Sequence, residues 1–407
     1  MSDRPRQFRG ALVALTSLFF MWGLITSLND ILVPHLKAAF ALNYVRAMLI
    51  QFCFFGAYFV MSLPSGILVE RRGYKQGIII GLAVAGLGCL TFYPAAALKS
   101  YPWFLGALFV LASGITLLQV AANPYVTILG KPESAPARLS LTQAFNSLGT
   151  TIGPYIGSTF ILASGATASA DARLVQAPYL VLAAILCAIA LSFGMIRLPA
   201  TTDIVATGAG TPGPTQGIWS YRHLVLGAIG IFVYVGGEVS IGSFLVNFLG
   251  QEKIAALPAD VAGKYVSFYW GGAMVGRFIG SALMTRIKPA SLLAFNAVAV
   301  VVLLGIAMTS VGHTAMWVML AIGLFNSIMF PTIFALAIDG LGAHTGEGSG
   351  VLCMAIVGGA IVPRLQGWVA DSIGILNSYV VPAICYLYVA FYGLKGYRPS
   401  SRPAVAR

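Results

Sequence analysis

The chain has 407 residues, of which 58% are hydrophobic and only 9% are charged. Soluble globular proteins average roughly 45–50% apolar and about 25% charged residues, so this composition excludes an ordinary soluble enzyme, and it excludes disorder, which requires low hydrophobicity. The net charge of +12 comes from basic residues that stand between apolar runs and not on one face, so we expect no nucleic-acid partner. The composition is that of a polytopic membrane protein.

Taken in chain order, the sequence predicts twelve transmembrane helices, because one span needs roughly 20 apolar residues. The first apolar run follows Arg4, Arg6 and Arg9 and contains no A-x-A-like cleavage site, so we interpret it as a retained span and not as a signal peptide. The predicted spans cover 11–33, 46–69, 77–97, 101–123, 139–163, 178–197, 222–249, 262–285, 290–311, 314–338, 348–370 and 376–394.

A polar stretch separates the twelve spans into two sets of six. It contains the run T-G-A-G-T-P-G-P-T-Q-G, whose composition is typical of a flexible linker. The sequence therefore predicts an all-α membrane protein with an N-terminal six-helix bundle over 1–197, a cytoplasmic linker over 198–221 and a C-terminal six-helix bundle over 222–407.

The basic residues predict how the chain is oriented in the membrane. With the N-terminus inside, 16 of the 24 Lys and Arg fall in cytoplasmic segments and 6 on the opposite side, while Arg277 and Arg364 lie within spans. Cytoplasmic loops carry an excess of Lys and Arg. We therefore expect both termini in the cytoplasm, as an even number of spans requires.

Landmarks in the two halves recur at nearly one offset. The pairs are Asp30 and Glu238 (208 residues apart), Pro124 and Pro331 (207), Pro154 and Pro363 (209), and Gly149 and Gly358 (209). Two repeats with a cavity between them are the architecture of transporters that work by alternating access. The offsets therefore predict two pseudo-symmetric bundles and favour a transporter.

Two carboxylates are candidates for cation coupling. Ten of the twelve acidic residues fall in or beside predicted loops, and only Asp30 and Glu238 are deep in spans. An ionised carboxylate in a bilayer costs at least ~2.5 kcal/mol, so such groups usually face a cavity on an ion or substrate route. An apolar environment disfavours the charged form, so such a carboxylate can bind and release a proton. The alternative is a structural ion pair with Arg277 or Arg364.

Uncharged polar residues in the first half are candidates for substrate binding. Carboxamides both donate and accept hydrogen bonds, which suits the vicinal hydroxyls of a sugar, and aromatic rings such as Tyr269 can stack on its apolar face. The alternative for each amide is a hydrogen bond between helices. Arg364 can be a sugar ligand, a counter-ion or a residue that extends outward to the interface. The candidate substrate-binding residues are Asn29, Gln51, Gln119, Asn123, Gln143, Asn146, Tyr269 and Arg364.

Nothing in the sequence predicts an enzyme. H-E-x-x-H, G-x-S-x-G and P-loop spacings do not occur, and the four His lie at span ends or in loops. The five Cys are widely spaced inside apolar runs, without metal or disulfide spacing, so we interpret them as small buried hydrophobic residues. We expect no catalytic residue, no bound metal and no cofactor.

Several long motifs resemble the fucose–proton symporter family of the major facilitator superfamily, and more closely its glucose/galactose branch. They are L-N-D-I-L-V-P-H-L at 28–36, L-I-Q-F-C-F-F-G-A-Y-F at 49–59, L-Q-V-A-A-N-P-Y at 118–125, L-T-Q-A-F-N-S-L-G at 141–149, P-T-I-F at 331–334 and the stretch 358–363. The resemblance covers nearly the whole chain. It implies a two-bundle sugar importer driven by protons or, alternatively, by sodium.

The resemblance also implies roles for particular residues. The family's span-1 carboxylate corresponds to Asp30, and its span-5 polar pair to Gln143 and Asn146. In the fucose branch a carboxylate stands at the position of Gln119, whereas this chain has an amide there and a carboxylate at Glu238. Asp30 and Glu238 are therefore expected to divide the coupling between them.

The run G-I-L-V-E-R-R-G-Y-K over 66–75 resembles the superfamily's cytoplasmic gating loop. Within it, the resemblance assigns gating roles to Gly66, Arg71, Arg72, Gly73 and Lys75. Glu70 departs from the pattern, because an Asp is usual near that position.

These observations together predict a multi-pass transporter of the bacterial inner membrane that imports a neutral monosaccharide of the glucose/galactose type by cation symport. L-fucose, mannose and N-acetylglucosamine remain alternative substrates, sodium remains an alternative to the proton, and a sugar uniporter is an alternative mechanism. A channel and a sugar receptor are rivals from other classes. The expected partners are the sugar and the lipid bilayer, with a monomeric protein.

Overall fold

The computed structural model describes residues 10–26, 40, 44–157, 176–195 and 217–399, and within these ranges every regular element is a helix. Nine helices in this part of the chain are long and apolar enough to cross a membrane, and a tenth, shorter apolar helix covers Gly10–Thr26. Each of the twelve predicted spans corresponds to helical structure in the described residues, since α5 and α9 account for the other two.

In the first half the helices follow the predicted spans closely. After Gly10–Thr26 they are α2 (Tyr44–Arg72), α3 (Tyr74–Ala97), α4 (Tyr101–Ile128), the short 3-10 helix η1 (Pro132–Ser134), α5 (Ala135–Gly157) and α6 (Gln176–Met195).

The run 66–75, predicted as a gating loop, is almost entirely helical. Only Gly73 separates α2 from α3, and its φ of 82° lies in the left-handed region that favours glycine. The loop is therefore a one-residue turn that leaves Arg71 and Arg72 in the last turn of α2.

In the second half, three spans that the sequence predicts as continuous are interrupted. Residues 327–328, the 3-10 turn over Ala355–Val357, and Tyr379 mark the interruptions, while Gly374, with its φ of 87°, lies between the eleventh and twelfth predicted spans. The helices are η5 (Ile218–Ser220), α8 (Arg222–Leu249), α9 (Ala259–Leu283), α10 (Pro289–Thr309), α11 (Gly312–Asn326), α12 (Met329–Ala337), η6 (Gly342–His344), α13 (Thr345–Met354), η7 (Ala355–Val357), α14 (Gly358–Ile373), α15 (Ile375–Ser378), α16 (Val380–Phe391) and the π-helical turn η8 (Tyr392–Gly396).

The chain divides into two compact units. Unit 1 consists of Met1–Leu129, Thr142–Gly208 and Ser349–Met354, and unit 2 consists of Gly130–Leu141, Ala209–Gly348 and Ala355–Arg407. Each unit therefore includes a short segment from the other half of the chain. In unit 1 the Ser349 hydroxyl donates to the Val120 carbonyl (2.8 Å), and in unit 2 the Ser281 hydroxyl donates to the Ala137 carbonyl (2.8 Å).

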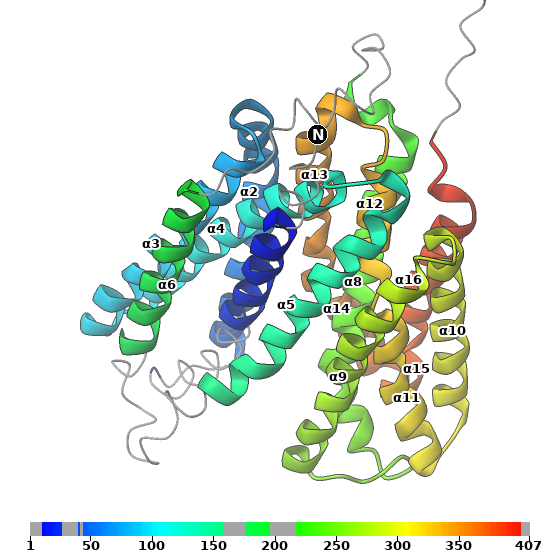
Figure 1. The fold of residues 1–407 in the computed structure, drawn as a ribbon. Coiled ribbons are helices and arrows are strands. Elements are labelled where there is room, and N and C mark those ends of the chain that lie inside the picture. Colours follow the sequence, from blue (N-terminus) through cyan, green and yellow to red (C-terminus); the bar gives the residue numbers. More distant parts are fainter. Residues whose placement is uncertain (1–9, 27–39, 41–43, 158–175, 196–216, 400–407) are drawn as a thin grey trace, which may run out of the picture. The chain divides into compact units, whose positions relative to one another are not determined.

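Helices pack in the same pairs within each unit. In unit 1, α4 packs against α2 and α3, and α3 packs against α6; in unit 2, α11 packs against α9 and α10, and α10 packs against α16 (Figure 1). Corresponding spans of the two halves make corresponding contacts. This agrees with the nearly constant offset between landmarks in the sequence and identifies the two units as structural repeats.

Two glycines at the 209-residue offset occupy equivalent positions in these repeats. A Cβ atom on Gly149 of α5 would clash with the backbone carbonyl of Phe20, and one on Gly358 of α14 would clash with the backbone carbonyl of Phe232 in α8. In both units the first and fifth spans therefore touch backbone to backbone, as small residues permit in packed membrane helices.

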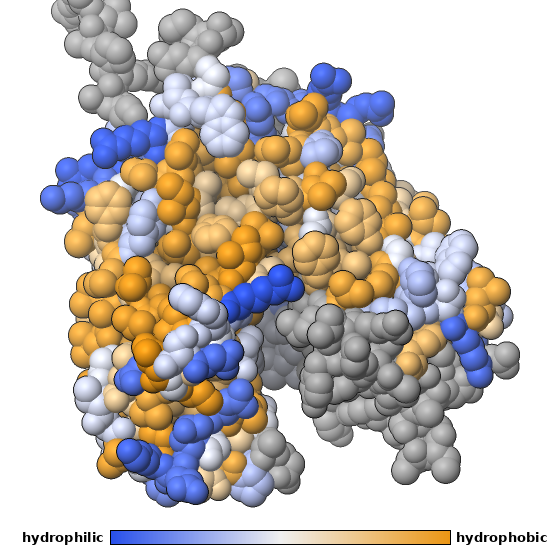
Figure 2. All heavy atoms as spheres, turned by 180° about the vertical axis from the view of Figure 1, so that it is seen from behind, coloured by the Kyte–Doolittle hydropathy of each residue, from blue (hydrophilic) through white to orange (hydrophobic). Residues whose placement is uncertain are grey.

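The outward sides of the helices are apolar. Figure 2 shows one face of the molecule covered largely by hydrophobic residues, with most hydrophilic residues toward its upper and lower edges. Large side chains such as Leu191, Phe295 and Trp368 are more than half exposed. Such surfaces are stable only against lipid, which agrees with a membrane protein.

Candidate functional site

The first polar cluster lies in unit 1, around Gln119 of α4. The Gln119 amide Nε2 donates to the Tyr58 hydroxyl on α2 (2.9 Å), and the Cys353 thiol on α13 contacts Gln119 Oε1 at 3.9 Å. All three side chains are buried. Tyr58 thus contacts the amide nitrogen of Gln119 and Cys353 contacts its amide oxygen. The cluster carries no formal charge.

Asn123 and Gln143 extend this cluster, one turn further along α4. Gln143 Nε2 of α5 donates to Asn123 Oδ1 at 3.4 Å, and Asn123 is fully buried. Asn123 Nδ2 has no hydrogen-bond partner among the described residues. A buried amide N–H without a partner is costly, so this donor is suited to a ligand oxygen.

Asn146 shares a face of α5 with Gln143 but contacts a different neighbour. Its Nδ2 donates to the backbone carbonyl of Phe19 on the helix Gly10–Thr26 at 2.9 Å. The interhelical hydrogen bond that the sequence left open as an alternative is therefore present for this side chain.

The second polar cluster lies in unit 2, at the break between α11 and α12. Pro331 has no N–H, so the carbonyl of Ser327, four residues earlier, cannot make a helical hydrogen bond. Arg277 Nε of α9 donates to that carbonyl at 3.0 Å, and the Tyr234 hydroxyl of α8 donates to the neighbouring Asn326 carbonyl at 2.9 Å. Side chains from two other helices thus satisfy the backbone groups that the break exposes.

Glu238 is half-buried beside this break, one helical turn after Tyr234 on α8. Its carboxylate interacts electrostatically with Arg277 of α9. The Tyr269 hydroxyl of α9 donates to the Glu238 backbone carbonyl (3.3 Å) and accepts a hydrogen bond from Asn326 Nδ2 (2.6 Å). The carboxylate, one cation and two tyrosines therefore form one network.

Polar atoms of this network are left without partners. Within the described residues, Glu238 Oε1, Asn326 Oδ1 and the Tyr386 hydroxyl of α16 are buried and have no hydrogen-bond partner. The Tyr386 ring packs edge to face against Tyr234, with ring centroids 6.4 Å apart. Because buried polar atoms are normally satisfied, the network has capacity for a cation or a ligand hydroxyl.

The structure places the other predicted site residues as follows. Asn29 and Asp30 lie outside the described residues, and Gln51 lies in α2 with its side chain outside them. Tyr269 is fully buried in the unit 2 network and does not present an open face for stacking. Arg364 is exposed on α14.

Of the predicted gating residues, Gly66 is buried in α2 and Arg71 and Arg72 are exposed at its end. Lys75 at the start of α3 donates from Nζ to the Gly194 carbonyl of α6 at 3.0 Å. Gly66 and Lys75 therefore contribute to packing around one turn of unit 1, whereas the two arginines are exposed there.

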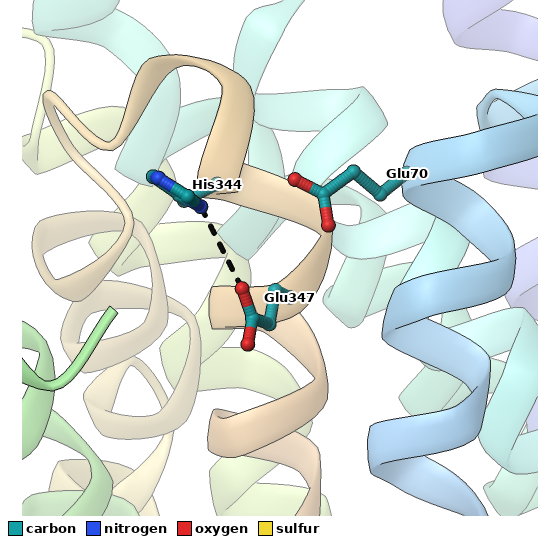
Figure 3. Close-up of side chains that lie close together, drawn as sticks. All are labelled: Glu70, His344 and Glu347. Carbon is teal, nitrogen blue, oxygen red and sulfur yellow. Dashed lines mark ion pairs between the residues drawn. The ribbon is translucent and has the colours of Figure 1, made fainter. Parts of the chain in front are cut away.

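A pair of titratable side chains lies at the start of α13 in unit 2. His344 Nδ1 and Glu347 Oε2 are 3.6 Å apart, and Figure 3 shows the imidazole directed at the carboxylate. Glu70, also drawn there, is exposed in the last turn of α2 of unit 1. The negative charge of Glu347 in the first turn of α13 is favourable at the positive end of the helix dipole.

Sequence reasoning missed several members of the clusters. Asn326 carried a usable signal, since it is an amide inside an apolar run five residues before Pro331. Cys353, interpreted as a small hydrophobic residue, also contacts a polar side chain. Tyr234 and Tyr386 carried no signal, because the chain contains 17 tyrosines and their sequence neighbours are ordinary.

Comparison with known proteins agrees with this architecture. The chain matches the model of the Major Facilitator Superfamily over residues 12–361. It is 60% identical over 398 residues to a glucose/galactose transporter of Brucella abortus biovar 1 (strain 9-941), covering 97% of this chain and 96% of that protein. It is 34% identical to the L-fucose-proton symporter of Escherichia coli (strain K12), covering 93% and 91%.

A solved structure gives the same result for the fold. The crystal structure of the Major Facilitator Superfamily transporter FucP in the outward conformation aligns with a TM-score of 0.86 and 33% identity, covering 95% of this chain and 99% of that chain.

Proposed function

The chain belongs to the Major Facilitator Superfamily, and from this premise we propose that it imports a neutral monosaccharide of the glucose/galactose type together with a cation, most simply a proton. It is a multi-pass protein of the bacterial inner membrane, and the described residues account for twelve helical spans. We also propose that both termini are cytoplasmic, because alternate loops carry an excess of basic residues. The proposed transporter is a monomer.

The observation that carries the proposal is 60% identity along almost the whole chain to a glucose/galactose transporter. The uncharged amides of unit 1 support it chemically. Gln119, Asn123 and Gln143 present donors and acceptors that are buried and held by neighbouring side chains. An array of neutral hydrogen-bonding groups favours a neutral polyhydroxylated ligand over an ion.

Two carboxylates, Glu238 and Asp30, are proposed to couple sugar transport to the movement of the cation. Glu238 supports this role because its carboxylate oxygen Oε1 is buried without a partner among the described residues, and because the carboxylate interacts electrostatically with Arg277. A carboxylate in such a place changes its interactions sharply when it gains or loses a proton. Asp30, outside the described residues, is proposed as the second coupling carboxylate on the strength of its sequence position.

An uptake experiment tests the proposal. The purified protein is reconstituted into liposomes, and uptake of labelled D-glucose, D-galactose, L-fucose, D-mannose and N-acetyl-D-glucosamine is measured with no gradient, an inward proton gradient or an inward sodium gradient. We expect glucose and galactose to accumulate with the proton gradient alone.

Other outcomes of this experiment would identify the alternatives. Accumulation driven only by sodium would replace the proton with sodium, and exchange without accumulation would identify a uniporter. Flux that does not saturate would indicate a channel, and sugar binding without counterflow would indicate a receptor. Preference for L-fucose or N-acetyl-D-glucosamine would contradict the proposed substrate.

A further inference from the structure

Buried polar atoms without partners gather in unit 2 where α8, α14 and α16 pack against one another. Four side chains there are fully buried and have a polar atom with no hydrogen-bond partner among the described residues: the hydroxyls of Ser240, Tyr379 and Tyr386 and Oε1 of Gln366. Buried polar groups are normally satisfied by protein or by ordered water. Four such atoms on three adjoining helices therefore indicate a shared partner.

The two tyrosines face α8 from two levels of α16. A Cβ on Gly237 of α8 would lie 3.2 Å from the Tyr386 ring. The ring of Tyr379, directly before α16, packs edge to face against Phe248 of α8, with ring centroids 5.4 Å apart. Seven residues separate the tyrosines, which is two helical turns or about 10 Å along the axis. Both rings therefore lie in the interface between α8 and α16.

Ser240 places a polar atom between these two levels. It follows Gly237 by three residues, so it lies on the same side of α8, about one turn beyond the level of Tyr386. Buried serines in unit 1, such as Ser113 and Ser147, donate to a carbonyl of the preceding turn. The Ser240 hydroxyl has no such bond and is available to another partner.

The level of Tyr379 carries further polar groups. Gln366 Nε2 of α14 donates to the hydroxyl of Ser378, the neighbour of Tyr379, at 3.2 Å, while its Oε1 has no partner among the described residues. Pro382 has no N–H, so the carbonyl of Ser378, four residues earlier, has no helical donor. The end of the interface thus presents several groups that can bond to water.

Glu238 lies at the inner end of this series. It follows Gly237, on which Tyr386 packs, and its Oε1 is also buried without a partner in the described structure. The outer end is the end of the unit at which α8 and α14 end, at Leu249 and Ile373. With cytoplasmic termini, that end is the periplasmic one. The polar atoms therefore lead from the periplasmic side to a carboxylate.

We propose that ordered water molecules between α8, α14 and α16 form a proton route from the periplasmic end of unit 2 to Glu238. The inference rests on the proposed function, because it takes the proton as the coupled cation. Buried waters make about three hydrogen bonds each, which satisfies the atoms left without partners. With oxygens about 2.8 Å apart, roughly three waters cover the distance between the two tyrosine levels.

Proton transfer along this route is balanced at every step. Each water or hydroxyl accepts a proton from one neighbour and releases another to the next, so every O–H bond that forms is matched by one that breaks. Only two groups change in number of protons: the periplasmic solvent loses one, and the Glu238 carboxylate gains it.

X-ray radiolysis of the wild-type protein in liposomes tests whether the route is hydrated. Brief exposure converts water into hydroxyl radicals, which oxidise the side chains next to that water, and mass spectrometry locates the products. We expect Tyr379 and Tyr386 to be oxidised although both are fully buried. Tyr392 is the matched control, because it is equally buried but its hydroxyl donates to the His223 carbonyl at 3.2 Å. It should stay unlabelled.

Transport measurements test whether the route carries protons. Tyr379→Phe and Gln366→Leu remove polar atoms from its outer level. Galactose uptake driven by an inward proton gradient needs a proton to reach Glu238 in every cycle, whereas equilibrium exchange of galactose proceeds while that proton stays bound. We expect both variants to lose gradient-driven uptake several-fold and to keep the wild-type exchange rate. Tyr388→Phe, whose hydroxyl donates to the Leu226 carbonyl near the start of α8 (3.1 Å), should keep both rates.

The outcomes separate this inference from the proposed function. If either Tyr379 or Tyr386 stays unlabelled, the route is interrupted and the inference is overturned. If both variants keep wild-type uptake, or lose exchange together with uptake, the inference is again overturned while symport by the wild type stands. If the wild type does not accumulate galactose with a proton gradient, the proposed function fails, and the inference fails with it.

Discussion

The two polar clusters lie in repeats with the same helix pairing, yet their chemistry differs. In unit 1 the amides of Gln119, Asn123 and Gln143 bond to one another and to Tyr58, and the cluster carries no formal charge. In unit 2 a carboxylate and a guanidinium lie beside a broken helix, and three buried polar atoms have no partner among the described residues.

This difference shows which properties of a repeated bundle are conserved by packing and which are free to diverge. Both units keep the backbone contact between their first and fifth spans, at Gly149 and at Gly358, because a side chain there would clash. The polar positions face no such constraint. One unit can therefore specialise in recognising hydroxyl groups while the other specialises in responding to a proton.

The largest expected effect comes from the contacts that the two units share. Gly149→Val and Gly358→Val each place a side chain against a backbone carbonyl, which cannot move away by changing a rotamer. We expect each to cost about 3 kcal/mol, at the upper end of typical overpacking costs. Thermal unfolding of the detergent-solubilised protein measures this as a lower Tm.

Gly305→Val on α10 is the control, because a Cβ there would meet no atom within 4 Å. Its Tm should stay near that of the wild type. If one of the two contact glycines tolerates valine and the other does not, the equivalence of the repeats at this contact is broken.

An intermediate effect should follow from disrupting the neutral cluster. Gln119→Leu leaves the Tyr58 hydroxyl without its buried donor, and we expect sugar affinity to weaken by about 1–2 kcal/mol, roughly five- to thirtyfold. Isothermal titration with galactose measures the change. Tyr58→Phe and the double variant complete a mutant cycle, in which the two losses should not add.

The pH dependence of exchange should be unchanged in Gln119→Leu. If Gln119→Leu altered the pH dependence of exchange, the division between a recognition cluster and a proton-responsive cluster would be contradicted.

The smallest effect is expected for Arg364→Ala. The sequence made Arg364 a candidate sugar ligand, but its side chain is exposed on α14. Exposed substitutions usually change free energies by no more than about 0.5 kcal/mol, so galactose affinity should change by roughly twofold or less. A loss of affinity as large as that of Gln119→Leu would return Arg364 to the binding site and extend recognition into unit 2.

The architecture was predictable from the sequence because long apolar runs, basic residues and repeated prolines are each readable along the chain. The interruption of span 10 was not, although Pro331 was noted as a landmark. A proline in an apolar run shows that one hydrogen bond is missing, but not whether the helix continues, as it does through Pro124 in α4, or breaks, as it does before Met329.

The candidate sites were predictable in part for a similar reason. Glu238 and the amides stand out because polar groups are rare in spans, and Gln119, Asn123 and Gln143 do lie together. Their partners do not stand out. Tyr234, Tyr386 and Cys353 acquire their roles only when α8, α16 and α13 bring them to a polar neighbour, and that depends on packing between distant segments.

The missing N–H of Pro331 has a consequence for how the helices of unit 2 are tied together. The vacancy at the Ser327 carbonyl is covalent in origin, so it persists in every state of the protein and at every pH; only the group that fills it can change. In Pro331→Ala we expect the new backbone N–H to fill it permanently and the helix there to be more stable. The same change would exclude Arg277 Nε from that carbonyl, so the gain in local stability would come with the loss of a hydrogen bond between α9 and the break.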